Sequence, residues 1–221
     1  MNKLDTVVID PHSQHRSTVI WLHGLGDSGH GFAPIVPALN LPKDLGIKFI
    51  FPHAPVQPVT INGGMKMRAW YDIKNISFKD RVDLRGIQNS AELVKQLIDT
   101  EISAGIPSEK IILAGFSQGG VITYYLGLQY TQTLAGLMTL STYIANSDTV
   151  SDERHMANQK TPLFIAHGLY DPVVPYQLAE QAQIILKRLN YQVEFHSYPI
   201  EHSVCPEEVA MISKWIQRCL T

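Results

Sequence analysis

Cysteine, long apolar runs and an excess of either charge are scarce or missing in this sequence. The 221 residues include 2 cysteines, and 18 Lys and Arg against 20 Asp and Glu give a net charge of −2. Without a basic field, binding to nucleic acid is not expected, nor is strong attraction to an anionic membrane. Since no stretch of about 20 apolar residues occurs, we expect no transmembrane helix.

The two cysteines, Cys205 and Cys219, fall near the two ends of one expected helix. At 1.5 Å per residue they would lie about 21 Å apart, whereas disulfide-bonded cysteines lie within ~7 Å of each other. We therefore expect two free thiols, which favour a reducing compartment and hence the cytoplasm. The first five residues carry no long apolar signal region, which agrees with that location.

Apolar, β-branched runs alternate with helical patterns along the chain, and we see no internal repeat. This alternation predicts an α/β fold with a mostly parallel central sheet and helices on both faces. The first two strands resemble a hairpin and are expected to pair antiparallel. No linker or change of composition divides the chain, so one domain is expected over residues 1–221. The expected strands are 6–10, 17–22, 48–51, 110–115, 136–141, 163–167 and 192–198, and the helices 86–104, 118–129, 176–190 and 206–219, with a short one near 32–39.

Residues 115–119, Gly-Phe-Ser-Gln-Gly, stand between an apolar run and a helical pattern. A G-x-S-x-G sequence at a strand-to-helix turn is typical of the nucleophile elbow of a serine hydrolase. The turn is too tight for Cβ atoms at either flank, and it forces Ser117 into a strained conformation with its Oγ exposed. The alternative is a glycine-rich turn around an inert serine, so the partners of Ser117 must decide.

A catalytic serine needs a base, commonly a histidine that a buried carboxylate orients. In the α/β-hydrolase arrangement the chain order is Ser, then Asp or Glu, then His. Asp171 follows the strand 163–167 in a loop that leads into a helix, which is where open α/β sheets keep functional groups. The alternative is that Asp171 only caps a turn before Pro172. Asp148 and Asp152 compete, but no strand runs directly into their segment.

His202 is the expected base among nine histidines. It lies between the last expected strand and the last helix, and it comes after Asp171 on a loop at the carboxyl end of a strand. If His202 is the base, the rate of hydrolysis should fall as the pH decreases from about 7 to 6, because an ordinary imidazole takes up a proton in this range.

Residues 21–27, Trp-Leu-His-Gly-Leu-Gly-Asp, follow from the second strand as a glycine-rich loop. Glycines let backbone amides approach a substrate carbonyl, so we expect an oxyanion hole made by the N–H groups of Leu25 and Gln118. His23 is expected to orient this loop through hydrogen bonds. The loop lacks the Lys-Ser/Thr of a P-loop and the third glycine of a dinucleotide fingerprint, which argues against phosphate binding.

Together these stretches resemble the carboxylesterase, phospholipase and acyl-protein thioesterase family of small α/β-hydrolases. The resemblance runs through nearly the whole chain in family order and is far more specific than any single motif. The matching stretches are 22–27 (LHGLGD), 51–55 (FPHAP), 58–64 (PVTINGG), 67–73 (MRAWYDI), 115–120 (GFSQGG), 167–175 (HGLYDPVVP) and 202–205 (HSVC).

The resemblance implies Ser117 as nucleophile, Asp171 as orienting acid and His202 as base, with the Leu25 and Gln118 amides as oxyanion hole. It also implies hydrolysis of carboxylic esters and thioesters without a metal or other cofactor. Its substrates would be small-molecule or lipid acyl esters, including lysophospholipids, and acylated proteins. One departure is Tyr143, where eukaryotic thioesterases of the family often carry tryptophan beside the acyl channel.

Two segments, 52–85 and 141–160, are too long for plain connections, and long loops in compact domains are usually functional or disordered. The first holds many large apolar residues, so we expect it to form a wall of an acyl pocket, to which Leu25 also contributes. Neither segment is large enough for a full helical lid, which predicts an open site with a broad substrate range. For Trp70, ordinary core packing is an equal alternative. The expected substrate-binding residues are Met65, Met67, Trp70, Tyr143, Val173 and Val174.

Other readings of the chain remain open at this stage. A catalytically inactive hydrolase fold could bind a ligand or partner protein, and a serine-reactive phosphonate would separate it from an enzyme. A peptidase or a long-chain lipase is disfavoured because no cap, lid or interfacial surface is visible. A nucleophilic pair of Cys205 and His202 would leave the Ser117 elbow without a purpose. Exposed apolar residues around Phe78 or Tyr143 could support a homodimer.

Overall fold

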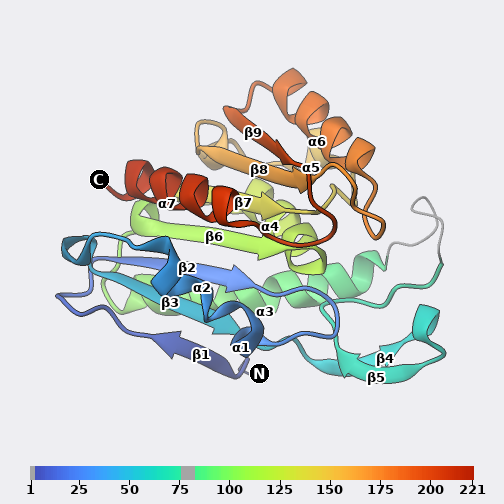
Figure 1. Ribbon diagram of the computed structural model, residues 1–221, viewed down its shortest axis with the longest axis horizontal. Coiled ribbons are helices and arrows are strands. Elements are labelled where there is room, and N and C mark those ends of the chain that lie inside the picture. Colours follow the sequence, from blue (N-terminus) through green and yellow to red (C-terminus); the bar gives the residue numbers. More distant parts are fainter. Residues whose placement is uncertain (1–2, 76–82) are drawn as a thin grey trace.

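The computed structural model describes residues 3–75 and 83–221 and has one large β-sheet at its centre (Figure 1). The sheet has seven strands in the order β1-β3-β2-β6-β7-β8-β9. Five of its six pairings are parallel, and only β1 with β3 is antiparallel. The strands are β1 (Thr6–Ile9), β2 (Ser17–Leu22), β3 (Ile47–Pro52), β6 (Ile111–Phe116), β7 (Gly136–Leu140), β8 (Leu163–Gly168) and β9 (Val193–Tyr198).

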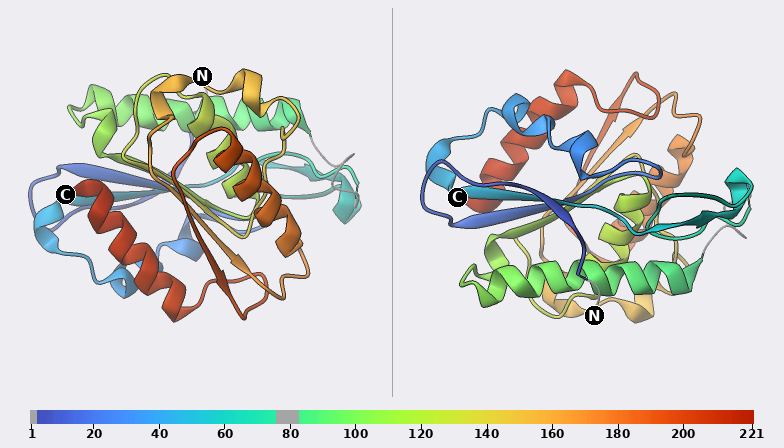
Figure 2. Two further views of the ribbon diagram at one scale, coloured as in Figure 1. Left: turned by 90° about the horizontal axis from the view of Figure 1, so that it is seen from above. Right: turned by 90° about the horizontal axis from the view of Figure 1, so that it is seen from below.

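Helices cover both faces of this sheet, as the alternating pattern predicts (Figure 2). The helix α3 lies on one side, and α2 and α7 lie together on the other. The helices are α1 (Gly29–Phe32), α2 (Ile35–Leu39), α3 (Leu84–Ser103), α4 (Gln118–Gln129), α5 (Val150–Glu153), α6 (Tyr176–Arg188) and α7 (Pro206–Leu220), with 3₁₀ turns at Lys43–Leu45, Thr60–Asn62, Ser108–Lys110 and Met156–Asn158.

The core is divided by the sheet into two layers, because successive side chains of a strand point to opposite faces. In β2, Ile20 and Leu22 pack in the layer that also holds side chains of α3, α4 and α6, here called the α4 face. Val19 and Trp21 pack in the layer with α2 and α7, called the α7 face. All of β2 is buried, and its residues 19–22 form a continuous apolar run, as expected of a central parallel strand.

The first two strands were expected to pair antiparallel with each other, and this is wrong because β1 has a different partner. β1 pairs antiparallel with β3, and β3 in turn pairs parallel with β2. The chain thus places β3 between the first two strands. The short helix expected near 32–39 is two helices, α1 and α2, with Pro34 as the N-cap of the second. Proline has no backbone N–H to continue α1, so the chain begins a new helix there.

The described part of the segment 52–85, residues 52–75 and 83–85, contains more regular structure than the expected loop. It contains a hairpin of β4 (Val56–Val59) and β5 (Met65–Arg68), which pair antiparallel and project from one end of the molecule (Figures 1 and 2). Gly63 and Gly64, with φ of 66° and 77°, supply the left-handed conformations that the turn needs. Within residues 3–75 and 83–221, none of the helices combines the length and apolar character that crossing a bilayer requires.

Candidate active site

Ser117 occupies the turn between β6 and α4 and has φ 53° and ψ −117°. Such a conformation costs a non-glycine residue about 1–3 kcal/mol, so the surroundings must hold it. The Ser117 N–H donates to the carbonyl of Leu140 at 2.8 Å, and the Ser117 carbonyl accepts from Thr142 Oγ1 at 2.7 Å. Two residues from the neighbouring strand end therefore fix the strained turn from both sides of the serine.

The glycines on either side of Ser117 stand where a side chain would collide with backbone. A Cβ at Gly115 would lie 2.3 Å from the carbonyl oxygen of Gly119, and one at Gly119 would lie 2.6 Å from that of Leu22. These clashes are with main-chain atoms, which cannot rotate away. The crowding expected from the G-x-S-x-G pattern is thus present at both flanks.

Hydrogen bonds join Ser117, His202 and Asp171, which follow the carboxyl ends of three different strands. His202 Nε2 lies 2.8 Å from Ser117 Oγ, and His202 Nδ1 lies 2.6 Å from Asp171 Oδ2. A carboxylate can only accept, so Nδ1 carries a proton and the neutral ring leaves Nε2 free to accept from the serine hydroxyl. The geometry is that of a nucleophile, a base and an orienting acid.

Asp171 is held as an anion although its side chain has no exposed surface. Burial alone would raise its pKa, but hydrogen bonds with His167, His202 and the backbone of Val174 outweigh it and hold the pKa well below the usual range. The other carboxylate oxygen, Oδ1, accepts from the N–H groups of Val173 and Val174, both at 2.8 Å. Asp171 therefore does more than cap a turn, because the same turn aims Oδ2 at His202.

His167 is a contact of Asp171 that the sequence analysis did not single out. Its Nε2 donates to the carbonyl of Val174 at 2.8 Å and lies 3.4 Å from Asp171 Oδ2. The ring is fully buried in β8, and His167 Nδ1 has no partner among the described residues. The available signal was a histidine at the end of a strand, four residues before the acid.

The two backbone amides expected to form the oxyanion hole donate to no other group among the described residues. Within residues 3–75 and 83–221, neither the Leu25 nor the Gln118 N–H donates a hydrogen bond. The neighbouring Gly26 N–H, in contrast, is occupied by the carbonyl of Arg68 at 2.9 Å. Gln118 is also the first residue of α4, so the positive end of the helix dipole adds to the attraction for an anion.

The Gln118 side chain fixes the segment after β5. Its Oε1 accepts from the Trp70 N–H at 2.8 Å, and its Nε2 donates to the Tyr71 carbonyl at 2.7 Å. Sequence reasoning assigned only the backbone of Gln118. The side chain ties the turn around Ser117 to Trp70 and Tyr71, which follow the hairpin.

His23 orients the glycine-rich loop, as expected. Burial lowers its pKa against the opposing hydrogen bond to Gly24, so the ring is kept neutral. Nδ1 donates to the Gly24 carbonyl at 2.7 Å, and Nε2 accepts from the Ala54 N–H at 3.0 Å. The His23 carbonyl in turn accepts from the indole N–H of Trp70 at 2.8 Å. This interlocked set holds the loop that carries Leu25.

The six expected substrate-binding residues divide by exposure. Met65 and Val173 are open to solvent, Met67 is partly exposed, and Val174, Tyr143 and Trp70 are buried. Trp70 has no exposed surface, and its indole N–H holds the loop that carries Leu25. It offers a substrate no surface in this conformation, in line with the core-packing alternative. At 7% exposure, Tyr143 is buried, so the expectation that its side chain is exposed is wrong. Phe78 lies outside the described residues.

Cys205 and Cys219 are both free, as the helix spacing predicts. Burial raises the pKa of each thiol, to about 12 for Cys219, which disfavours the reactive thiolate. This argues against Cys205 as a nucleophile. Among the described residues, no group of three or more His, Cys, Asp or Glu side chains is arranged to hold a metal ion.

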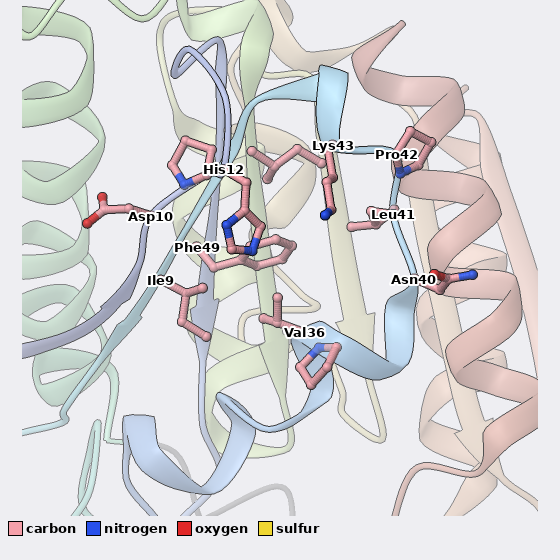
Figure 3. A pocket seen from close by; sticks show the side chains of 12 residues that line it. Ile9, Asp10, His12, Val36, Asn40, Leu41, Pro42, Lys43 and Phe49 are labelled. Atoms are coloured by element: carbon pink, nitrogen blue, oxygen red, sulfur yellow. The ribbon is translucent and has the colours of Figure 1, made fainter.

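A pocket far from these groups lies at the opposite edge of the sheet (Figure 3). Its walls come from the end of β1, from α2 and from the start of β3, including His12, Val36 and Phe49. Because β3 runs parallel to β2, the start of β3 is at the end of the sheet away from the Leu25 loop. The pocket in Figure 3 therefore has no access to Ser117.

Comparison with known proteins gives matches over almost the whole chain. The sequence model described as phospholipase/carboxylesterase matches residues 4–220. A protein of Neurospora crassa named acyl-protein thioesterase 1 is 41% identical over 213 residues, which cover 92% of this chain and 87% of that protein. A protein of the same name from Schizosaccharomyces pombe is 38% identical over 218 residues, covering 97% and 96%.

Solved structures agree with this fold. The crystal structure of SOBER1 from Arabidopsis thaliana superposes with a TM-score of 0.86 at 33% identity, covering 93% of this chain and 100% of that one. The crystal structure of acyl-protein thioesterase 2 from Zea mays gives a TM-score of 0.87 at 31% identity, covering 98% and 99%.

Proposed function

The chain belongs to the phospholipase/carboxylesterase family and is a serine hydrolase of esters and thioesters; from this premise we propose that Ser117, His202 and Asp171 carry the reaction. The observation that supports these roles is the chain of hydrogen bonds from Ser117 Oγ through His202 to Asp171, at 2.8 Å and 2.6 Å. The strained backbone of Ser117 adds to it, since residues held in sparsely populated backbone conformations cluster at functional sites.

The proposed reaction has two halves that use the same base. His202 Nε2 takes the hydroxyl proton as Ser117 Oγ attacks the acyl carbon, and the resulting oxyanion accepts hydrogen bonds from the Leu25 and Gln118 amides. His202 then gives that proton to the departing alcohol or thiol as its bond to the acyl carbon breaks. In the second half, water loses a proton to His202 and attacks the acyl-enzyme, and the free acid leaves as Ser117 Oγ regains the proton.

Asp171 stays ionised throughout this cycle. Its depressed pKa keeps the carboxylate negative at neutral pH, where it stabilises the imidazolium that forms when His202 takes the serine proton. The acid also fixes the tautomer, because the hydrogen bond at Nδ1 leaves Nε2 as the acceptor.

The preferred substrates are proposed to be carboxylic esters with short to medium acyl chains. The acyl group would lie on the α4 face, where Leu25 and Met67 pack against the core and are themselves partly exposed. Met67 is suited to varied chains because its thioether is flexible and polarizable. A cytoplasmic location remains a prediction from the two free thiols. A homodimer also remains a prediction, and the buried Tyr143 does not support it.

Acyl-protein thioesterase activity is the second candidate, and the names of the two fungal relatives favour it. It would use the same groups, because a thioester passes through the same acyl-enzyme. The comparison that separates the candidates is kcat/KM for an S-acylated cysteine peptide against an oxygen ester of the same acid. A ratio well above that of the uncatalysed reactions would place the thioester first.

The test of the catalytic roles is hydrolysis of p-nitrophenyl esters from acetate to palmitate by the wild type and Ser117→Ala. We expect the substitution to lower kcat by about 10⁴-fold or more, as in other triads. Ser151→Ala, at an exposed serine of α5, is the matched control and should keep full activity. More than a tenth of wild-type activity in Ser117→Ala, or no labelling of Ser117 by a serine-reactive phosphonate, would remove the proposal.

The acyl-chain series also reports the shape of the acyl site. A maximum at short or medium chains would mean a shallow site and a general carboxylesterase. A kcat/KM that rises through long chains would mean a deep channel, and would move lysophospholipids and acylated proteins ahead of small esters.

A further inference from the structure

A second cavity opens directly beside the proposed base and has no role in the reaction described above. It has a volume of about 350 Å³ and is lined by His202, by Phe116 next to the nucleophile, and by side chains of α1, α2 and α7. Its apolar walls are Phe32, Ile35, Phe116, Val204 and Val209.

The aromatic rings at this cavity form a continuous surface that starts at the base. The centroids of Phe116 and His202 lie 4.8 Å apart, and those of Phe32 and Phe116 lie 5.3 Å apart. Phe116, Phe32 and His202 are each partly exposed. Among the described lining residues, only His202 and Ser203 bring polar side chains, so the cavity suits an apolar group.

This cavity and the proposed acyl site lie on opposite faces of the sheet. Phe32, Phe116 and Val209 pack on the α7 face, whereas Leu25 and Met67 pack on the α4 face. Ser117 stands at the edge between them. An ester bound at Ser117 with its acyl chain on the α4 face therefore directs its other half toward the α7 face.

The position of His202 indicates that the part of the ester directed toward the α7 face is its leaving group. His202 Nε2 must pass its proton to the leaving oxygen or sulfur, so the leaving atom comes within hydrogen-bond reach of this ring. The rest of the leaving group then continues along the ring. We propose that the cavity between Phe32, Ile35 and Val209 binds the apolar part of the alcohol or thiol leaving group.

The proposal, which rests on the catalytic roles given above, defines a substrate class. Preferred substrates are esters and thioesters whose leaving group carries an aromatic or branched apolar group a few bonds from the reacting atom. At about 350 Å³, the cavity is at the lower end of the range for small-molecule sites and fits one such group, not an extended chain.

The test varies the alcohol and keeps the acid constant. Butyrate esters of ethanol, hexanol and 2-phenylethanol are primary alkyl esters of similar chemical reactivity, so differences in kcat/KM report binding of the leaving group in the transition state. For the wild type we expect kcat/KM to be about tenfold higher for 2-phenylethyl butyrate than for ethyl butyrate. This is the lower end of the gain expected from burying a phenyl group.

Two variants on the cavity wall and one matched control locate that preference. Val209→Phe fills the cavity and should reduce the tenfold ratio to about two, because the phenyl group of the substrate no longer has room there. Ile35→Ala removes contact area and should reduce the ratio about threefold. Val36→Phe makes the same change as Val209→Phe in the remote pocket of Figure 3 and should leave the ratio intact.

The outcomes separate this proposal from the catalytic roles. A ratio near one in the wild type, or a ratio that neither Val209→Phe nor Ile35→Ala reduces, would overturn the leaving-group site even if all activity depends on Ser117. Activity that survives in Ser117→Ala would instead overturn the catalytic roles. If Val209→Phe loses its near-UV circular dichroism and does not fold, Ile35→Ala decides.

Discussion

Asp171 and Glu208 are two buried carboxyl groups that come before and after His202 in the sequence, and they differ in charge at neutral pH, since Asp171 is ionised and Glu208 is neutral. Asp171, after β8, is held ionised by several donors, and its pKa lies well below the usual range. Glu208, in the first turn of α7, is 1% exposed, and burial raises its pKa to about 8 against one opposing hydrogen bond with the Cys205 backbone. Glu208 Oε1 has no partner among the described residues.

The difference between the two regions lies in donors and not in burial. Burial disfavours the charged form of both acids, as it must in a medium of low polarity. At Asp171, Val173, Val174 and His202 donate to the two oxygens at 2.6–2.8 Å and reverse the effect. The acid loop after β8 is therefore organised to keep a negative charge in the interior, whereas the start of α7 keeps a neutral acid there.

The largest expected effect comes from breaking the charge at Asp171. Asp171→Asn keeps the shape but presents an amide that can donate to His202 Nδ1 and favours the tautomer with a proton on Nε2. That ring cannot accept the Ser117 proton, so kcat should fall by about 10⁴-fold, as it does for the equivalent change in other triads. The measurement is kcat with p-nitrophenyl butyrate.

Asp152→Asn is the control for Asp171→Asn, because Asp152 is an exposed acid on α5. It should retain wild-type kcat. A loss of less than tenfold in Asp171→Asn, in a protein with native circular dichroism, would contradict the assignment of Asp171 as the orienting acid.

The next effect is on the free energy of unfolding, and it concerns the neutral carboxyl group of Glu208. A native pKa of about 8, against 4.5 for the unfolded chain, means that the contribution of Glu208 is fully present below about pH 4.5 and is lost as pH rises through about 8. By pH 8.5 the loss should reach a few kcal/mol. Glu208→Gln, which stays neutral, should therefore unfold at higher urea concentration than the wild type at pH 8.5 and at nearly the same concentration at pH 5.

Glu207→Gln provides the matched comparison for Glu208→Gln, since Glu207 is exposed in the same turn of the same helix. Its difference from the wild type should not change between pH 5 and pH 8.5. Parallel stability curves for Glu208→Gln and the wild type across this range would show that Glu208 is not neutral in the folded protein.

The sequence predicts best those features of the fold that local signals specify. The strand β2 and the helix α4 have the expected bounds, Ser17–Leu22 and Gln118–Gln129, because an apolar run and a glycine turn define them without reference to the rest of the chain. The serine, acid and histidine were expected at strand ends for the same reason. Parallel strands bring their carboxyl ends to one edge, so separate local signals meet at one place.

Features that depend on contacts between distant segments were not predictable from those signals. β1 pairs with β3 and not with β2, and nothing local to β1 specifies that choice. Trp70 is fully buried, and its N–H donates to the side chain of Gln118, which lies 48 residues away. The β4–β5 hairpin is different, because Asn-Gly-Gly at 62–64 is a turn signal that could have been used.

The smallest expected effect comes from His167, a more distant donor near Asp171. His167 Nε2 lies 3.4 Å from Asp171 Oδ2, farther than the three donors already described, and it also donates to the Val174 carbonyl. His167→Leu removes this donor and loosens the turn that supplies the Val174 N–H. One neutral hydrogen bond contributes about 1 kcal/mol, so kcat should fall about fivefold to tenfold while KM stays constant.

His167→Gln distinguishes a positioning role from plain packing. Its amide can donate to the Val174 carbonyl, so it should recover part of the kcat lost in His167→Leu, although the two side chains differ little in size. Equal kcat values in the two variants would mean that His167 only fills space in β8. Recovery by the amide would mean that a donor in β8, outside Ser117, His202 and Asp171, helps to keep Asp171 ionised, whereas Glu208 has one opposing hydrogen bond and an Oε1 without a partner among the described residues.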